Sequence, residues 1–126
     1  MHSFRAAIEA RDIAAAVALL SDNVVLRSPV VFKPYQRREA VEPILHAVSR
    51  VFEDFRYVRE IGSEDAAHHA LVFEARIGDQ QVEGCDFIHI DDSGLIDELM
   101  VMVRPLTATL ALTEAMKAQV AAAEQR

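Results

Sequence analysis

The chain has 126 residues, of which 52% are hydrophobic and 26% are charged, and its formal net charge is −7. This length predicts a single domain over residues 1–126 that is large enough to bury a hydrophobic core. The acidic balance excludes nucleic acid and anionic membranes as partners, and no apolar run reaches the roughly 18 residues of a membrane-spanning helix. The charged N-terminus is unlike a signal peptide and the single cysteine, Cys85, excludes an internal disulfide, so we expect a cytoplasmic protein.

Helical periodicity is found at both ends of the chain and over one central segment. Apolar residues recur at roughly helical spacing over residues 3–20, where Asp12 interrupts them and predicts a break between two helices. Residues 38–54 carry a continuous apolar face, and Pro43 lies near their start, where a missing N–H is tolerated. A final helix is predicted over residues 106–123.

Strand signals fill the segments between these helices. Residues 24–28 predict a short strand, and residues 30–36 are irregular or a short strand because Pro34 limits pairing. Four further strands are predicted over residues 55–61, 67–77, 81–90 and 95–104. Helices followed by an antiparallel meander indicate an α+β fold.

The most informative segment is the hairpin predicted over residues 84–105. Its turn is Asp91-Asp92-Ser93-Gly94, and the runs on both sides favour strands. Asp86 lies inside the first strand, between Cys85 and Phe87. A carboxylate at such a position must be exposed, paired, or kept neutral by a pocket. A carboxyl group that a pocket keeps neutral would indicate a catalytic or ligand-binding role for Asp86.

Seven short segments carry a family resemblance when they are taken in order and spacing. They are Ala10-Arg11-Asp12-Ile13, Val17-Ala18-Leu19-Leu20-Ser21-Asp22, Ser28-Pro29, Arg38-Glu39-Ala40-Val41, Gly84-Cys85-Asp86-Phe87, Asp92-Ser93-Gly94-Leu95-Ile96 and Val103-Arg104-Pro105-Leu106. Together they resemble the SnoaL-like branch of the nuclear-transport-factor-2-like superfamily, with one departure at Arg37, where relatives usually carry glycine. The resemblance implies a cone, in which a strongly bent antiparallel sheet wraps around three helices and leaves a deep apolar pocket.

The resemblance also implies which positions carry chemistry. Ketosteroid isomerases of this superfamily use a tyrosine on the first helix, an aspartate base just before a proline, and a protonated aspartate inside a late strand. Along this chain these positions fall on Phe4, Ser28 and Asp86, so one of the three groups is retained. A serine does not shuttle a proton between carbons as a carboxylate does, which disfavours that isomerase mechanism. The SnoaL-like polyketide cyclases use an acidic residue as acid/base, a role that Asp86 fits.

Strand alternation predicts the neighbours of Asp86. If residues 78–82 close the preceding hairpin, Glu74 lies opposite Asp86, and two close carboxylates in an apolar cavity raise one pKa. We therefore predict Asp86 and Glu74 as a catalytic acid/base pair. With the positions that the resemblance implies, the predicted pocket wall also contains Phe4, Ser28, Tyr35, His68, Val72, Ile88, Leu99, Val101 and Val103.

The opposite face of the predicted sheet is hydrophobic as well. It carries Leu71, Phe73, Phe87, Met100 and Met102, and hydrophobicity alone would make it the core face. The resemblance instead turns Asp86 inward, and a sheet that is apolar on both sides needs a second cover. We therefore predict a homodimer through this face. No metal or cofactor is expected, because the five histidines form no ligand pattern.

The sequence is compatible with two functions. The first is a cofactor-free enzyme that binds a small apolar substrate, such as an isomerase, cyclase or hydrolase, with Asp86 as acid/base. The second is a non-catalytic ligand-binding or dimerisation module in which Asp86 is structural. A cavity with a buried Asp86 in its wall and no fixed partner favours the first, and a filled core favours a structural module.

Overall fold

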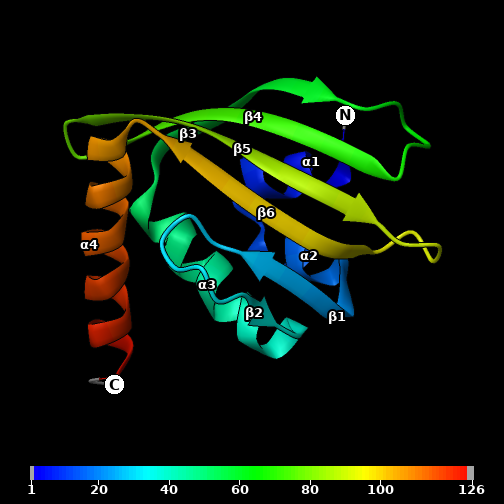
Figure 1. Cartoon of the computed structure of the whole chain (residues 1–126), viewed down its shortest axis with the longest axis horizontal. Helices are drawn as coiled ribbons and strands as arrows, with labels where there is room; N and C mark the ends of the chain where they lie inside the picture. Colours follow the sequence, from blue (N-terminus) through cyan, green and yellow to red (C-terminus); the bar gives the residue numbers. More distant parts are fainter. Residues whose placement is uncertain (1, 125–126) are drawn as a thin grey trace.

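A computed structural model describes residues 2–124 of the chain (Figure 1). Its elements are α1 (Ser3–Glu9), α2 (Ile13–Ala18), β1 (Leu20–Arg27), β2 (Tyr35–Gln36), α3 (Arg38–Val51), β3 (Glu53–Ile61), β4 (His68–Ile77), β5 (Gln80–Ile90), β6 (Ile96–Arg104) and α4 (Leu106–Glu124). Within the described residues, six strands form one sheet in the order β2-β1-β6-β5-β4-β3. Neighbouring strands are antiparallel except for β1 and β6, which are parallel.

The sheet curves over the first three helices and leaves its other face open. Figure 1 shows α1 and α2 behind the sheet, α3 in the lower part of the view, and α4 standing at one end. Buried side chains such as Phe4, Val41 and Leu71 fill the space between the sheet and the helices. This architecture confirms the predicted α+β fold. No helix among residues 2–124 is long and apolar enough to cross a membrane.

The predicted break at Asp12 separates α1 from α2. Asp12 is the N-cap of α2, where its side-chain oxygen accepts a hydrogen bond from the N–H of Ala15 at 3.0 Å. His2 caps α1 in a similar way, because its Nδ1 accepts from the N–H of Phe4 at 3.1 Å. The two caps set the start of each short helix.

The first strand starts earlier than the sequence predicts, at Leu20 rather than at residue 24. Leu20 is fully buried and pairs with Ile96 of β6. The turn-forming segment Ser21-Asp22-Asn23 lies inside the strand, where the pairing with β6 shifts register. Burial and pairing of Leu20 therefore override the local turn preference of these polar residues.

The β4–β5 hairpin corrects the predicted neighbour of Asp86. Its turn contains Gly78 and Asp79, because Ile77 pairs with Gln80. Asp86 consequently pairs with Leu71, whereas Glu74 pairs with Glu83. The prediction of Glu74 opposite Asp86 is wrong by an odd number of residues, and such a shift turns every side chain of β4 to the other face of the sheet.

The same shift corrects the face that was predicted to form a dimer. Leu71 and Phe73 are each 1% exposed, so they lie in the core and are not available to a second subunit. Phe87 and Met102 are 40% and 53% exposed on the outer face, and Met100 lies there as the cross-strand partner of Phe87. The outer face therefore holds three of the five predicted residues, and Asp86 faces inward.

Arg37 has a backbone conformation that favours glycine. It precedes α3 with φ 80° and ψ 149°, a region that is costly for any residue with a Cβ. Its N–H donates to the carbonyl of Val24, and its carbonyl accepts from Val41, so the backbone is held in this conformation. The side chain of Arg37 contributes little to the stability of the fold, because it is 70% exposed and its ion pair with Glu39 lies on the surface.

Replacing Arg37 with glycine should stabilise the protein by about 1 kcal/mol, because relief of the strained conformation outweighs the backbone entropy of glycine. Arg50→Gly is the matched control, since Arg50 is an exposed residue in the last turn of α3 and should lose about 1 kcal/mol. Chemical denaturation of the three proteins measures both changes. An Arg37→Gly variant that is less stable than the wild type contradicts this account of Arg37.

Candidate functional site

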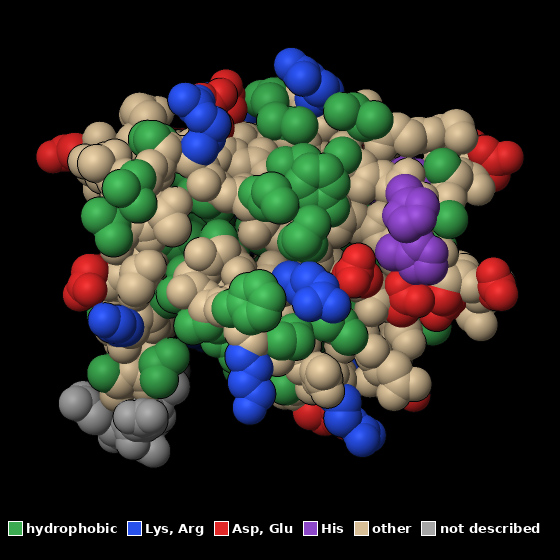
Figure 2. All heavy atoms as spheres, in the orientation of Figure 1, with side chains coloured by type: hydrophobic (Ala, Val, Ile, Leu, Met, Phe, Trp, Pro, Cys, Tyr) green, Lys and Arg blue, Asp and Glu red, His purple; other side chains and the backbone are tan. Residues whose placement is uncertain are grey.

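A cavity of about 430 Å³ lies between the sheet and the helices. This volume is in the range of small-molecule sites. Its wall is mostly hydrophobic and comes from α1, α3, α4, the sheet and the loop after β1, with Ile8, Leu45, Leu99 and Met116 as examples. Figure 2 shows a hollow with hydrophobic side chains beside α4, on the face of the molecule turned to the viewer.

Four aromatic rings form one part of the cavity wall. Phe55 stacks on Phe73 with a centroid distance of 4.8 Å, and Phe52 lies 5.5 Å from Phe73. Tyr57 meets the edge of Phe55 at 4.9 Å. The rings come from β3, β4 and the residue that follows α3, so the sheet supplies a rigid aromatic surface to the cavity.

Asp86 is the buried carboxyl of this cavity. Its side chain lies in the wall, and the residue is 6% exposed. Desolvation by burial raises the pKa of Asp86 to about 7, and the hydrogen bond from Tyr57 opposes this rise. Asp86 therefore holds or releases its proton within the neutral pH range.

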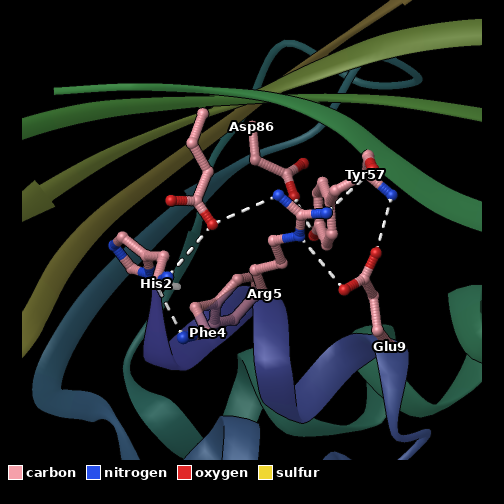
Figure 3. Close-up of polar contacts among 7 residues, drawn as sticks. His2, Phe4, Arg5, Glu9, Tyr57 and Asp86 are labelled. Carbon is pink, nitrogen blue, oxygen red and sulfur yellow. Dashed lines mark hydrogen bonds and ion pairs between the residues drawn. The ribbon is translucent and has the colours of Figure 1, made fainter.

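Tyr57 is the fixed partner of Asp86. Its hydroxyl donates to Oδ2 of Asp86 at 2.6 Å, and Figure 3 shows the ring of Tyr57 beside the carboxyl group. Burial, and then the charge of Asp86, raise the pKa of Tyr57 well above its usual value. The hydroxyl consequently stays protonated and acts as a donor to one of the two carboxyl oxygens of Asp86, Oδ2.

The remaining polar groups of the wall lie on other elements. The other charged residues are Arg11 and Lys117, and no second carboxylate lines the cavity in the described part of the chain. Arg11 donates to the carbonyl of Ser49 at 2.9 Å. The site is thus a single titrating acid in an apolar space, without the carboxylate pair that the sequence predicts.

Five of the predicted pocket residues lie in the cavity wall. They are Phe4, Ser28, Tyr35, Leu99 and Val101. Ser28 also has a local role, because its Oγ accepts a hydrogen bond from the N–H of Val30 at 3.0 Å. Val101 is the cross-strand partner of Asp86, which places the two side chains on the same inner face.

The other predicted residues lie elsewhere, so their assignment to the wall is corrected. Glu74 points outward and binds Arg56 at 2.8 Å, and Val72 shares that outer face because of the hairpin register. His68 is exposed and its ring lies 4.7 Å from that of His89. Ile88 is 2% exposed within the packed core, and Val103 borders a separate, shallow hollow near Gly84.

Sequence reasoning did not name Tyr57 or the aromatic surface. Alternation along β3 places Phe55 and Tyr57 on one face, which is a usable signal. The sequence does not reveal the register of β3 on β4. This register places Tyr57 opposite Phe73 and within hydrogen-bonding distance of Asp86.

The cysteine and histidines do not form a second site. Burial raises the pKa of the Cys85 thiol, and Cys85 lies on the outer face next to the inward-facing Asp86. His89 binds Asp97 at 2.6 Å, and this contact raises the pKa of His89. Among residues 2–124, no group of three or more His, Cys, Asp or Glu side chains is arranged to hold a metal ion.

Comparison with known proteins identifies relatives of this chain. The SnoaL-like domain family matches residues 1–99, and no curated protein matches the sequence. A solved steroid delta-isomerase from Pseudomonas aeruginosa is 39% identical, with a TM-score of 0.91 over 96% of this chain and 88% of that chain. An uncharacterised protein from Silicibacter pomeroyi DSS-3 with a cystatin-like fold is 31% identical, with a TM-score of 0.88 over 94% and 82%. A SnoaL-like protein of unknown function from Burkholderia thailandensis E264 is 12% identical, with a TM-score of 0.66 over 82% and 90%, which shows a shared fold alone.

These similarities agree with the geometry of the structure. A curved, unclosed sheet with N-terminal helices and a C-terminal helix is the architecture of the nuclear-transport-factor-2-like structures. The members of this superfamily include isomerases and cyclases, so the fold by itself does not select a reaction. From the match over residues 1–99 and the similarity to its solved relatives, the chain belongs to the SnoaL-like domain family.

Proposed function

We propose that this protein binds a small apolar molecule in the cavity and that Asp86 exchanges a proton with it. The observation that carries the proposal is the single buried carboxyl in a largely apolar wall, with a pKa raised to about 7. General acid–base catalysis is most efficient when the catalytic pKa lies near the working pH. Proton exchange with a ligand needs only this side chain.

The ligand that suits this cavity is a molecule with flat apolar rings and one carbonyl or hydroxyl oxygen. The aromatic rings of Phe52, Phe55 and Phe73 favour flat partners. Oδ2 of Asp86 accepts from Tyr57, so Oδ1 is the atom that meets the oxygen of the ligand. The relative described as a steroid delta-isomerase supports this ligand class, because it is 39% identical over nearly the whole chain.

The reaction class that we propose is isomerisation or cyclisation of a carbonyl compound. Protonated Asp86 donates its proton to the carbonyl oxygen, and the carboxylate that results accepts a proton from the α-carbon, so the ligand becomes its enol and Asp86 is protonated again. Asp86 then gives its proton to another carbon of the conjugated enol and takes the enol O–H proton back, which completes an isomerisation. Ser28 is in the wall at the position where ketosteroid isomerases place their base, and it supplies no carboxylate. A relay between two carboxylates is therefore not part of this proposal.

The alternative function is a binding module in which Asp86 is structural. The hydrogen bond of 2.6 Å from Tyr57 favours this alternative, because a fixed donor is what a structural carboxylate has. The cavity remains in both cases, so the two functions differ in whether the proton of Asp86 reacts with the ligand.

We also propose that the chain forms a homodimer through the outer face of the sheet. Figure 2 shows hydrophobic side chains gathered over the middle of β4, β5 and β6, where Phe87, Met100 and Met102 lie. Strand alternation places charged pairs on the same face, namely Arg27–Glu98, Arg56–Glu74 and Arg104–Glu83. An apolar centre with a polar rim is the usual composition of a protein interface.

A ketone should bind with a pH dependence that reports the proton of Asp86. We expect 2-acetylnaphthalene, whose oxygen only accepts hydrogen bonds, to bind roughly 3- to 10-fold more weakly at about pH 8.5 than at about pH 6, because ionised Asp86 no longer donates. Fluorescence titration across this range measures the change in Kd.

Two controls separate the proposed functions. Asp86→Asn should remove the pH dependence, because its amide donates at every pH, and 2-ethylnaphthalene, which lacks the oxygen, should bind equally at all pH values. Equal binding of the ketone at both pH values supports a structural Asp86 and contradicts the acid/base role. Failure of both naphthalenes to bind contradicts the proposed ligand class.

The buried carboxyl should also make stability depend on pH. The folded-state pKa of Asp86, about 7, is above the ordinary value of 3.8, so its contribution is fully present below about pH 4 and is lost as the pH rises through about 7. The expected loss is at most about 4 kcal/mol at 1.36 kcal/mol per pH unit. Urea denaturation at several pH values should show this decline in the wild type and a smaller one in Asp86→Asn. Equal slopes for the two proteins contradict the raised pKa.

Met102→Glu should convert the proposed dimer into a monomer, because it places a charge in the apolar centre of the outer face. Leu110→Glu is the matched control, since Leu110 is 56% exposed on α4, outside the sheet. Sedimentation velocity measures the molecular mass of each protein. A wild type that sediments as a monomer at all concentrations contradicts the dimer.

A further inference from the structure

Tyr57 lies at an irregular point of the edge strand β3. It pairs with Phe73 of β4, and the register shifts between Tyr57 and Arg59. A shift of this kind bends a strand and changes where its side chains point. An edge strand also has backbone groups without a neighbouring strand to bind them. The position of the Tyr57 hydroxyl consequently needs support from outside the sheet.

Two side chains of α1 provide this support. Oε2 of Glu9 accepts a hydrogen bond from the N–H of Tyr57 at 3.1 Å, and Nη2 of Arg5 donates to the carbonyl of Tyr57 at 3.2 Å. Both backbone groups of one residue are thus bound by one helix, as a neighbouring strand would bind them. Figure 3 shows Arg5 and Glu9 reaching from α1 toward the strand that carries Tyr57.

The two side chains also hold each other. Nε of Arg5 donates to Oε1 of Glu9 at 3.1 Å, one helical turn away, and both side chains are about one-quarter exposed. Nη1 of Arg5 lies 3.4 Å from Glu60, whose carboxylate also accepts from the N–H of His2 at 3.0 Å. The contact with Glu9 raises the pKa of Arg5, so the guanidinium group stays charged. A pair fixed on both sides is a rigid clamp rather than a loose surface ion pair.

Arg5 and Glu9 do not line the cavity, whereas Phe4 and Ile8 of the same helix do. The hydrogen-bonded contact of the pair with the site therefore runs through the backbone of Tyr57. We propose that Arg5 and Glu9 are positioning residues, which clamp the backbone of Tyr57 so that its hydroxyl stays on Asp86. This inference deepens the proposed function, because it names what sets the proton affinity of the acid.

The test is the pKa of Asp86 in the ligand-free protein, measured by NMR titration of its side-chain carboxyl. Tyr57→Phe removes the hydroxyl and should raise this pKa, because the hydrogen bond from Tyr57 lowers it. Glu9→Ala should raise it in the same direction, by roughly half to one pH unit, because the hydroxyl is no longer held in place.

The sign of the change separates positioning from plain electrostatics. Removal of the negative charge of Glu9 by itself favours the ionised form of a nearby carboxyl, so it lowers the pKa of Asp86. A rise in Glu9→Ala therefore supports the clamp, and an unchanged or lowered pKa overturns it. Glu9→Gln keeps an oxygen for the N–H of Tyr57 and should restore much of the wild-type value.

Two further variants complete the experiment. Glu98→Ala breaks the Arg27–Glu98 pair of 3.3 Å on the outer face, far from Tyr57, and should leave the pKa of Asp86 unchanged. In Glu9→Ala combined with Tyr57→Phe, the pKa should lie at or slightly below that of Tyr57→Phe alone, because only the charge effect of Glu9 is left, and a further rise overturns the clamp. If Glu9→Ala does not fold, Glu9→Asp replaces it, because the shorter side chain loses its reach to β3 and should raise the pKa as well. Because no ligand is involved, these results are independent of whether the naphthalene probes bind.

Discussion

The structure depends on bringing a hydroxyl from the edge strand to a carboxyl near the middle of the sheet. Tyr57 is on β3 and Asp86 is on β5, so the hydrogen bond between them crosses β4. Gly84 makes room for this crossing, because a Cβ at that position would lie 2.2 Å from Cζ of Phe73. The ring of Phe73 therefore lies against the backbone of β5 and packs near Tyr57. The close packing of Phe73 against Gly84 therefore supports both the aromatic surface of the cavity and the position of Tyr57, which is the partner of Asp86.

The sequence predicts the parts of this site that local patterns determine. Alternation around Asp86 predicts which residues of β5 share its face, and the family resemblance turns that face inward, where the structure has Asp86. The neighbour of Asp86 depends on the length of the β4–β5 turn, and one strand face looks much like the other when both are apolar. Leu71 and Phe73 belong to the more hydrophobic of the two faces of β4, and both are buried. On this strand, hydrophobicity therefore predicts the core face better than the assumed length of the turn does. Tyr57 depends on strand register and on side chains of α1, which no pattern within β3 contains.

The fold keeps a pocket while single positions decide its chemistry. Phe4 and Ser28 lie in the wall, where their side chains supply volume and no titrating group. The acid that remains is coupled to a tyrosine from β3 instead of one from the first helix, and the first helix acts through the backbone of that tyrosine. A sequence identity of 39% to a steroid delta-isomerase is therefore compatible with different residues of the same fold holding the buried acid.

Two opposing effects set the proton affinity of Asp86, and their balance determines what the cavity can do. Burial alone favours the neutral acid, which donates to a ligand and does not take its proton back at neutral pH. The hydrogen bond from Tyr57 favours the carboxylate, and more donors of this kind would leave an ion without a proton to give. One donor in a largely apolar wall holds the pKa at about 7, where both forms are populated. A ligand that displaces water from the wall shifts this balance toward the neutral acid, so binding and protonation of Asp86 favour each other.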